Sequence, residues 1–308
     1  MEVSRRISRL AKGLRKSAKR ITNPLERHLK TWSRESEVAG EIAAAKRARK
    51  LERVGPDFLI IGAPKCATSW LRFALSQHPE IITIKEELEY FSKGLHQPLK
   101  SYVSLFEAES DALDRLNSAY RRAFEDCMLG EKSASYCTLS RRRIRLIHQL
   151  VPEARLILVI RDPIRRHWAH AKRYFSKLYC NKKGLVLSDL QQGELFEFLR
   201  RTQAFSEYST MIENWQSVFG DEQLLVLTQE EALADPQRTF EQTLGHLGVA
   251  KVYDVNQVRL LSTRKNRGPD VAMPPQAMDY LVEMFAPEYR RLRTMFGGSL
   301  PTTWNQGF

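Results

Sequence analysis

The sequence predicts a single α/β domain with a mostly parallel central sheet flanked by helices. From Gly55 onward, short apolar runs alternate with helical stretches, which is the pattern of consecutive βαβ units. The 308 residues, of which 43% are hydrophobic and 28% charged, are enough to bury a large core. This composition excludes a collagen-like chain, a disulfide scaffold and a mostly disordered protein.

The expected elements follow one another along the chain. Short apolar runs predict strands, at Phe58–Ile61, Arg155–Ile160 and Gln223–Leu227, with Ile81–Ile84 as a further candidate. Helical patterning predicts helices, at Thr68–Ser76, Ser140–Leu150, Ile164–Phe175, Phe205–Phe219, Gln237–Leu247 and Pro275–Met295. Tyr208 and Trp215 lie seven residues apart in one of these helices, so both are expected to face the core.

Residues 1–54 form a basic N-terminal region. They contain 16 Lys and Arg against 6 Asp and Glu, a net charge of +10, whereas residues 55–308 contain 33 against 30. Apolar residues recur in this region at helical spacing, at Val3, Ile7, Leu10 and Leu14. We therefore expect a partly helical tail followed by a folded domain. The tail has the composition of a segment that contacts anionic lipid or nucleic acid, and equally that of a solvated extension.

The cellular setting is expected to be cytoplasmic. No apolar run approaches the ~20 residues that span a bilayer, and Arg and Lys occupy the positions where a secretory signal needs its apolar stretch. A peripheral contact of the basic tail with the inner face of the membrane fits this expectation. The four cysteines show no CxxC spacing and are expected to be reduced thiols, at Cys66, Cys127, Cys137 and Cys180.

The segment after the first predicted strand has the architecture of an anion site. Gly62–Ala67 is a tight loop of mostly small residues, and two hydroxyl residues, Thr68 and Ser69, open the following helix. Loop N–H groups and the first turn of a helix attract an anion, and Lys65 adds a full positive charge. The loop is not a Walker A motif, because Ala67 and Thr68 stand where that motif needs Gly and Lys. An ordinary βα turn is the alternative interpretation.

Pro64–Leu71 resembles the PKxGTSxL loop of sulfotransferases that use 3′-phosphoadenosine 5′-phosphosulfate (PAPS), in particular the heparan-sulfate-type and bacterial carbohydrate branches. The resemblance implies the sulfotransferase fold, with a P-loop-like phosphosulfate-binding loop in a catalytic domain over residues 55–308. It also implies that the donor is bound by the loop residues Lys65, Cys66, Ala67, Thr68 and Ser69. Ala67 replaces a glycine of the family, which strains the loop unless the φ angle of Ala67 is negative.

Two further segments resemble the family. Glu86–Phe91 is similar to its KExHFF segment, which implies that Glu87 is the catalytic base; Glu89 stands where many relatives have His. Without the resemblance, this segment would be interpreted as a solvated strand end. Gly130–Tyr136 is similar to the GEKSPxY segment, which implies that Lys132 steers the sulfonate or the acceptor. A surface lysine in a loop is the alternative.

Arg161–Arg166 follows a predicted strand and resembles the RDPxxR signature, whose first arginine binds the 3′-phosphate of the donor. The resemblance assigns this role to Arg161, whereas an Arg-Asp pair after a strand can also be a structural salt bridge. Eight residues on, where relatives usually carry a serine for the same phosphate, this chain has Ala169. The adjacent His170 is a candidate substitute or a packing residue.

Arg264–Pro269 is similar to the basic KGR loop that closes over the 3′-phosphate, which implies that Lys265 and Arg267 bind the donor. As a bare sequence, it is a basic turn. The segments occur in the order of the family and cover most of residues 57–270. Their order makes a chance resemblance improbable.

The resemblance implies that the protein transfers a sulfonate group from PAPS to an acceptor hydroxyl of a carbohydrate or glycolipid. Glu87 would be the base, and Lys65 would stabilise the charge that accumulates on the leaving phosphate. No metal is expected, because cationic side chains take the role that Mg²⁺ has in phosphoryl transfer. Three alternatives stay open: a nucleotide-dependent kinase on a similar scaffold, a membrane- or nucleic-acid-binding protein that acts through its tail, and a catalytically weakened homologue. Of the two tail partners, nucleic acid is the less expected.

Overall fold

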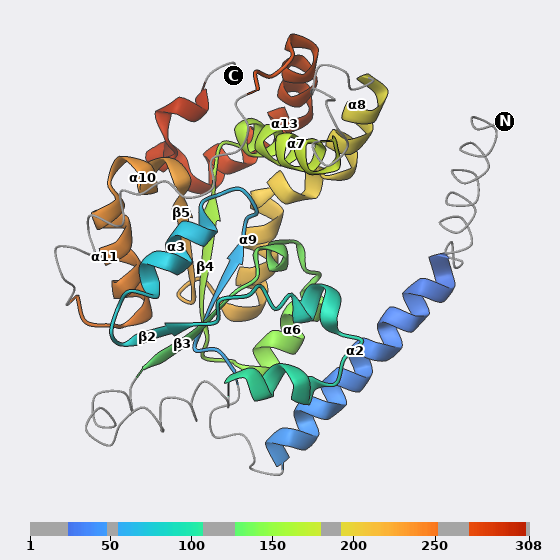
Figure 1. The fold of residues 1–308 in the computed structure, drawn as a ribbon, viewed down its shortest axis with the longest axis vertical. Coiled ribbons are helices and arrows are strands. Elements are labelled where there is room, and N and C mark those ends of the chain that lie inside the picture. Colours follow the sequence, from blue (N-terminus) through green and yellow to red (C-terminus); the bar gives the residue numbers. More distant parts are fainter. Residues whose placement is uncertain (1–23, 48–54, 107–126, 180–191, 252–270, 306–308) are drawn as a thin grey trace.

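The structure, a computed structural model, describes residues 24–47, 55–106, 127–179, 192–251 and 271–305 (Figure 1). Its centre is a parallel sheet of five strands in the order β2-β3-β1-β4-β5. The strands are β1 (Phe58–Gly62), β2 (Ile81–Thr83), β3 (Met128–Lys132), β4 (Arg155–Ile160) and β5 (Leu224–Thr228). The predicted fold class and the four predicted strands are confirmed, whereas β3 was not predicted.

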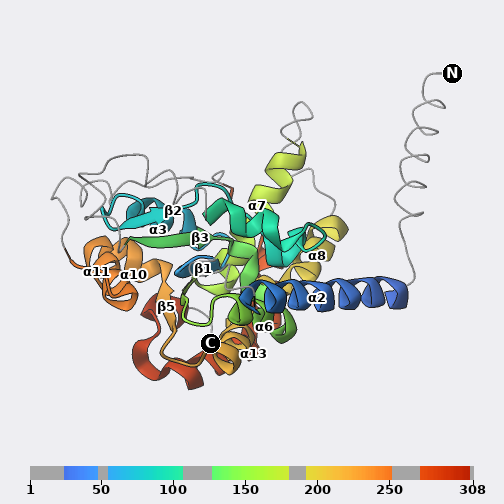
Figure 2. The same cartoon turned by 90° about the horizontal axis from the view of Figure 1, so that it is seen from below.

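Helices cover both faces of the sheet, which is why its central strands are apolar on both sides. On one face, α3 (Thr68–Leu75) lies against β1 and β2 and contacts α11 (Pro236–Leu247). On the other face, α6 (Arg141–Leu150) packs against α9 (Tyr208–Phe219) (Figure 2). All residues of β1 are buried between these layers.

The connection from β4 to β5 includes α7 (Pro163–Tyr179) and α8 (Gln192–Arg201), which lie at the upper end of the sheet in Figure 1, and α9, which runs back along the face that also holds α6. After β5 come α10 (Gln229–Ala234), α11 and α13 (Pro275–Phe296), and α13 contacts both α7 and α9. The six predicted helices are present, and α8 and α10 are additional. Tyr208 and Trp215 are both fully buried, which confirms the prediction that they belong to the core.

Residues 24–47 of the N-terminal region form a long helix, α2 (Pro24–Arg47), that packs along α6 (Figure 2). Val38 and Ile42 of α2 are buried. The Glu35 carboxylate forms ion pairs with Arg142 (2.9 Å) and Arg143 (2.8 Å) of α6. This part of the basic region is therefore attached to the domain. The predicted apolar face from Val3 to Leu14 lies outside the described residues.

The three described cysteines, Cys66, Cys127 and Cys137, are buried thiols outside any disulfide, as predicted, and Cys180 lies outside the described residues. None of the described helices combines the length and the apolar character needed to cross a bilayer.

Candidate active site

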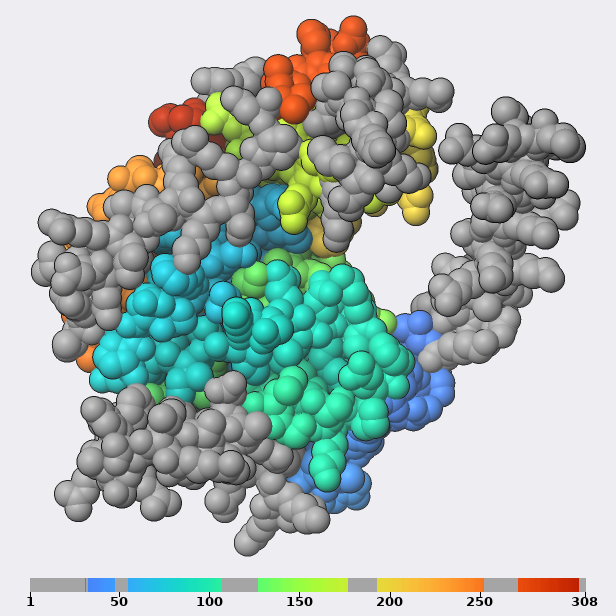
Figure 3. Space-filling model, viewed as in Figure 1, coloured from blue at the N-terminus to red at the C-terminus, as the bar shows by residue number. Residues whose placement is uncertain are grey.

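The predicted site residues lie where the strands of the sheet end. In a parallel sheet, the carboxyl ends of all strands meet at one edge, where ligands usually bind. Lys65 follows β1, Glu87 follows β2, Lys132 ends β3 and Arg161 follows β4. In the space-filling view, a notch opens on this side between the teal surface of residues 86–106 and the yellow-green surface of α7 (Figure 3).

The loop after β1 begins at a glycine that no other residue can replace. A Cβ atom on Gly62 would lie 2.6 Å from the Cβ of Cys137 and 2.8 Å from the carbonyl oxygen of Ala134, and the φ angle of Gly62 is +152°. Both contacts are with η2 (Ala134–Thr138), a 3-10 turn that follows β3. The absence of a side chain thus lets the loop lie directly on the turn that follows Lys132.

Two residues of the loop adopt left-handed backbone conformations. The φ angle is +73° at Lys65 and +60° at Ala67. The left-handed region costs a residue with a Cβ atom about 1–2 kcal/mol, so the replacement of the family glycine by Ala67 does strain this loop. Such strain is common in ligand-binding loops that the surrounding structure holds in place.

Several backbone donors of this loop have no acceptor among the described residues. Among the described residues, no hydrogen bond is made by the backbone N–H groups of Lys65, Ala67, Thr68 and Ser69. The N-cap residue of α3 is Ala67, which offers no capping side chain, and the first turn of α3 has no acidic residue. A helix start of this kind is completed by an anion, which accepts from the N–H groups and is favoured by the helix dipole.

Lys65 projects its charge into this site without a carboxylate partner. Its side chain is half-buried, and none of the described carboxylates lies within 4.0 Å of its ammonium group. Burial lowers the pKa of Lys65, and the positive charges of Arg173 and Arg166 lower it further, while Glu87 acts in the opposite direction. Because these charges repel one another, the loop offers a strong attraction to an anion.

Lys132 joins the proposed base to the loop. Its Nζ atom donates to Glu87 Oε1 at 2.5 Å and to Ser69 Oγ at 3.2 Å. The Lys132 side chain is only 6% exposed, so the alternative of a surface lysine is wrong. Glu87 is 39% exposed, and its Oε2 atom also accepts from the backbone N–H of Ala134 at 3.3 Å. The carboxylate is therefore held from two sides while it stays open to solvent.

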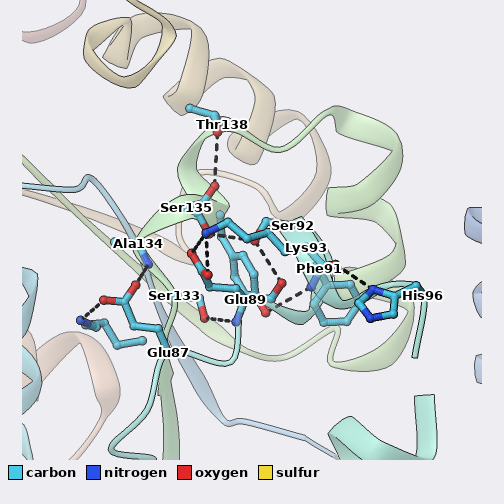
Figure 4. A network of polar contacts seen from close by, with 12 residues as sticks. Glu87, Glu89, Phe91, Ser92, Lys93, His96, Ser133, Ala134, Ser135 and Thr138 are labelled. Carbon is cyan, nitrogen blue, oxygen red and sulfur yellow. Dashed lines mark hydrogen bonds and ion pairs between the residues drawn. The ribbon is translucent and has the colours of Figure 1, made fainter. Parts of the chain in front are cut away.

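A network of polar contacts continues from Glu87 along the same segment (Figure 4). Both carboxylate oxygens of Glu89 accept from Lys93 Nζ at 2.7 Å. The φ angle of Glu89 is +49°, and its carbonyl oxygen accepts from the backbone N–H groups of Ser92, Lys93 and Gly94. These bonds form η1 (Tyr90–Gly94), a short π-helical turn. They hold Glu89 in a conformation that is otherwise costly.

A buried carboxylate beneath the site was missed by sequence reasoning. Glu131 is 1% exposed and accepts from Tyr102 Oη and Ser133 Oγ, both at 2.6 Å. Ser133 Oγ in turn accepts from the backbone N–H of Glu89 at 2.9 Å. Burial raises the pKa of Glu131. Glu131 thus connects the end of β3 to the segment that carries Glu87, and its position in the strand beside Lys132 was the only available signal.

Arg161 is available for a ligand, and the salt-bridge alternative is wrong. Asp162 Oδ1 accepts from the backbone N–H of Arg165 (2.7 Å) and Oδ2 accepts from Tyr289 Oη (2.8 Å), so Asp162 starts α7 and does not pair with Arg161. Burial raises the pKa of Glu230, and the charge of the nearby Arg161 acts in the opposite direction. Glu230 forms no ion pair with any described residue. Within the described structure, the Arg161 guanidinium has no carboxylate partner.

His170 follows the small Ala169 on α7 and is in contact with other groups. Its Nδ1 atom lies 3.1 Å from Arg166 Nη2, and since arginine can only donate, Nδ1 accepts and Nε2 carries the proton. Burial and the charge of Arg166 lower the pKa of His170 to about 3. The ring is therefore neutral at neutral pH and can offer a phosphate only the Nε2–H donor.

Two predicted donor ligands, Lys265 and Arg267, lie outside the described residues. Among the residues that are described, no group of three or more potential ligands gathers that could hold a metal ion. The loop residues, Glu87 and Lys132 form one site, with Arg161 at the end of the neighbouring strand.

The fold and the site define a class of protein: an α/β protein with a parallel sheet, a loop of available N–H donors after its first strand and a carboxylate near that loop. Residues 56–254 match the sequence profile of the sulfotransferase family. The chain therefore belongs to the sulfotransferase family, as the resemblance of its motifs predicted.

Relatives and solved structures agree with this assignment. The chain is 26% identical over 258 residues to the mouse bifunctional heparan sulfate N-deacetylase/N-sulfotransferase 4 and 24% identical to human N-deacetylase/N-sulfotransferase 3; each alignment covers 79% of this chain. The chain spans about a quarter of the length of these relatives (26%). A sulfotransferase from Alicyclobacillus acidocaldarius has the same fold, with a TM-score of 0.58, 24% identity and coverage of 81% of this chain and 98% of that one.

Proposed function

We propose that the protein transfers a sulfonate group from PAPS to a hydroxyl group of a carbohydrate or glycolipid acceptor. The observation that carries this proposal is the placement, near the Glu87 carboxylate, of Lys65 and loop N–H groups that have no partner among the described residues. We call the loop Gly62–Ser69, with Arg161 and Arg166, the donor side. Residues Glu87–Leu99 are called the acceptor side.

The residues present fit an anionic donor. The N–H groups of the loop and of the first turn of α3 would hold the 5′-phosphosulfate, with Lys65 beside the bridging oxygen of the leaving phosphate. Arg161 would bind the 3′-phosphate, together with Lys265 and Arg267. When bound, PAPS supplies the activated sulfonate and leaves as adenosine 3′,5′-bisphosphate. Cationic side chains neutralise the developing charge in this scheme, so it needs no metal.

Glu87 would act as the base. In the transfer, one S–O bond forms to the acceptor oxygen and one S–O bond breaks at the phosphate, and the hydroxyl proton passes to the Glu87 carboxylate. Lys132 keeps this carboxylate oriented through the 2.5 Å contact with Oε1. Because Lys132 also contacts Ser69 of the loop, it fixes the base relative to the donor side.

The carbohydrate part of the acceptor class rests on the relatives, whose names describe N-sulfation of heparan sulfate, a polysaccharide. The hydroxyl part rests on the placement of the Glu87 carboxylate beside the loop and not on these relatives. The direct test is sulfonate transfer from PAPS, without added metal, to a panel of neutral and anionic saccharides, with release of adenosine 3′,5′-bisphosphate as the readout. ATP with Mg²⁺ is the rival donor. Transfer from PAPS supports the proposal, whereas phosphoryl transfer from ATP and none from PAPS would identify the kinase alternative.

The basic N-terminal region has a separate proposed role, which is peripheral contact with anionic lipid at the inner face of the membrane. Its support is the net charge of +10 over residues 1–54. Sedimentation of the full chain with vesicles that contain anionic lipid tests this role. Binding that persists equally with neutral vesicles, or that is replaced by salt-sensitive binding to nucleic acid, would contradict it.

A further inference from the structure

Arg166 is a fully buried cation directly behind the loop of the donor side. It lies on α7, is 0% exposed and is among the largest fully buried side chains of the protein. Its Nε atom donates to the carbonyl oxygen of Pro64 at 2.9 Å. The side chain therefore holds the backbone of the loop at the residue before Lys65, and it does so from the protein interior.

The acceptors that the described residues offer to the Arg166 guanidinium are neutral. Nη1 donates to Ser206 Oγ at 3.3 Å and Nη2 donates to His170 Nδ1 at 3.1 Å, while the Phe205 ring lies 5.4 Å from the guanidinium carbon. Nη1 also lies 3.5 Å from Nδ1 of His167. In the part of the chain that the structure describes, no carboxylate lies within ion-pair distance of Arg166.

A buried charge without a counter-charge is unusual, because removal of an ion from water is costly and buried charges are normally paired. Arginine nevertheless stays protonated in proteins. The repulsion between Arg166 and Lys65 adds to this cost and contributes to the lowered pKa of Lys65. An anion in the loop would be attracted by both cations and would relieve both costs.

We propose that Arg166 is a positioning residue of the donor side, which fixes the Pro64 carbonyl and supplies a buried positive charge that is balanced only when the 5′-phosphate end of the donor lies in the loop. This inference rests on the proposed function. It also explains why two histidines surround the guanidinium: His167 and His170 serve as neutral acceptors for it, and protonation of either ring would remove an acceptor and add repulsion.

The primary test measures the affinity of the full chain for adenosine 3′,5′-bisphosphate by calorimetry in two variants. Arg166→Met removes the charge and is expected to weaken binding roughly 10- to 100-fold. Arg166→Lys keeps a charge and is expected to retain most of the affinity at pH 7. Equal affinity of Arg166→Met and the wild type would overturn the proposal, and so would an equal loss in both variants, because the charge would then be irrelevant.

A matched control is Arg143→Met. Arg143 also donates to backbone carbonyls, those of Phe91 (3.1 Å) and Ser92 (2.9 Å), but it is paired with Glu35 on α2. Its loss should lower thermal stability and leave the affinity for the bisphosphate unchanged. An equal loss of affinity in this control would mean that the Arg166 result reports general destabilisation.

A second readout needs only the Arg166→Lys variant, in case the Met variant does not fold. A buried lysine has a lowered pKa, so its charge is lost as the pH rises. The ratio of the dissociation constants at pH 9.5 and pH 7 should therefore be larger in this variant than in the wild type, where Lys65 is the shared titrating group. Equal ratios would overturn the proposal.

The other groups that face Arg166 do not change their protonation state between pH 7 and pH 9.5. Burial lowers the pKa of His167 and His170 to about 3, so both rings stay neutral. Burial raises the pKa of Cys66 to about 11 and that of Cys137 to about 12. It also raises the pKa of Tyr208 well above its usual value, so these groups stay protonated. Arg161 also acts on Arg166 and stays charged.

If the wild type itself fails to bind the bisphosphate, the proposed function is wrong, and not only the role of Arg166.

Discussion

The donor and acceptor sides of the site differ in whether their charged side chains form ion pairs. On the acceptor side, Glu87 is paired with Lys132 and Glu89 is paired with Lys93. On the donor side, Lys65, Arg161 and Arg166 have no carboxylate partner in the described structure. Paired charges orient each other without a ligand, whereas unpaired cations raise the free energy of the empty protein.

The supports of the two sides differ in the same way. The acceptor side is fixed by ion pairs and hydrogen bonds from α2 and α6: Arg143 donates to the carbonyls of Phe91 and Ser92, and Glu41 accepts from the backbone N–H of Leu99 (2.6 Å). On the donor side, the loop is strained at Lys65 and Ala67, and the buried Arg166 holds it through a hydrogen bond to the carbonyl oxygen of Pro64. We infer that the acceptor side is preformed and that the donor side is completed by its anion.

The largest effect is expected from Glu87→Gln. This change removes the proposed base and should lower turnover with a saccharide acceptor roughly 10²–10⁴-fold. Since Glu87 lies on the acceptor side, affinity for adenosine 3′,5′-bisphosphate should change little. The control Glu86→Gln removes the same charge from the neighbouring exposed residue and should reduce turnover far less. A fully active Glu87→Gln variant would refute the assignment of the base.

Lys65→Ala is expected to lower turnover by about 10²–10³-fold and, unlike Glu87→Gln, to weaken binding of the bisphosphate as well. The two variants therefore separate the sides by different measurements, steady-state rates and calorimetry. Lys46→Ala, which removes an exposed lysine of α2, should affect neither. Unchanged rates with reduced solubility would show that Lys65 has only a structural role.

The pH dependence of stability tests whether burial beside Arg166 keeps His170 neutral in the folded protein. The pKa of His170 is about 3 in the folded protein and 6.5 in the unfolded chain, so the unfolded chain binds more protons between these values. This contribution to stability is present above pH 6.5 and is lost as the pH falls toward 3. Urea unfolding gives the free energy of unfolding at pH 7 and at pH 5. The decrease between these pH values should be smaller in His170→Gln than in the wild type by about 2 kcal/mol. Identical losses would mean that His170 protonates freely beside Arg166.

A smaller effect is expected from Ala169→Ser, which restores the hydroxyl that relatives usually carry. One additional hydrogen bond to a phosphate, worth about 1 kcal/mol, should tighten the affinity for the bisphosphate by several-fold in calorimetry. The weakened-homologue alternative requires this gain. Unchanged or weaker binding would count against a missing contact at this position.

The smallest effect is expected from Ala67→Gly. Relief of the left-handed conformation should outweigh the larger entropy of glycine in the unfolded chain and raise the free energy of unfolding by about 0.5–1 kcal/mol. Ala44→Gly, in the exposed face of α2, should instead lower it by about 1 kcal/mol. An equal decrease in the free energy of unfolding in Ala67→Gly and Ala44→Gly would show that the loop is not strained at Ala67.

Much of the fold was predictable because the apolar runs of β1, β4 and β5 are continuous. Strand β3 was missed because Gly130, Glu131 and Lys132 interrupt its apolar pattern, and Glu131 is buried only because Tyr102 and Ser133 satisfy its carboxylate. The packing of α2 depends on ion pairs between residues more than 100 positions apart, such as Glu35 and Arg143, which no local pattern reveals.

The site was predictable in part from local sequence motifs. The motif segments indicated Lys65, Glu87, Lys132 and Arg161, because strand ends in a parallel sheet converge. They did not reveal that Arg166 has no counter-charge among the described residues, since pairing depends on which side chains of α7 and η4 (Gln203–Ser206) face the loop. Nor did they give the sign of φ at Ala67, which follows from how the loop lies against η2.

The central claim is that the donor side binds a doubly phosphorylated adenosine nucleotide through its unpaired cations. The most direct measurement is calorimetry of the full chain with adenosine 3′,5′-bisphosphate and, separately, with 5′-AMP. Binding of one bisphosphate per chain is expected, at least about tenfold tighter than 5′-AMP because Arg161 meets the 3′-phosphate. No binding of the bisphosphate at millimolar concentration, or equal affinity for the two nucleotides, would contradict this account.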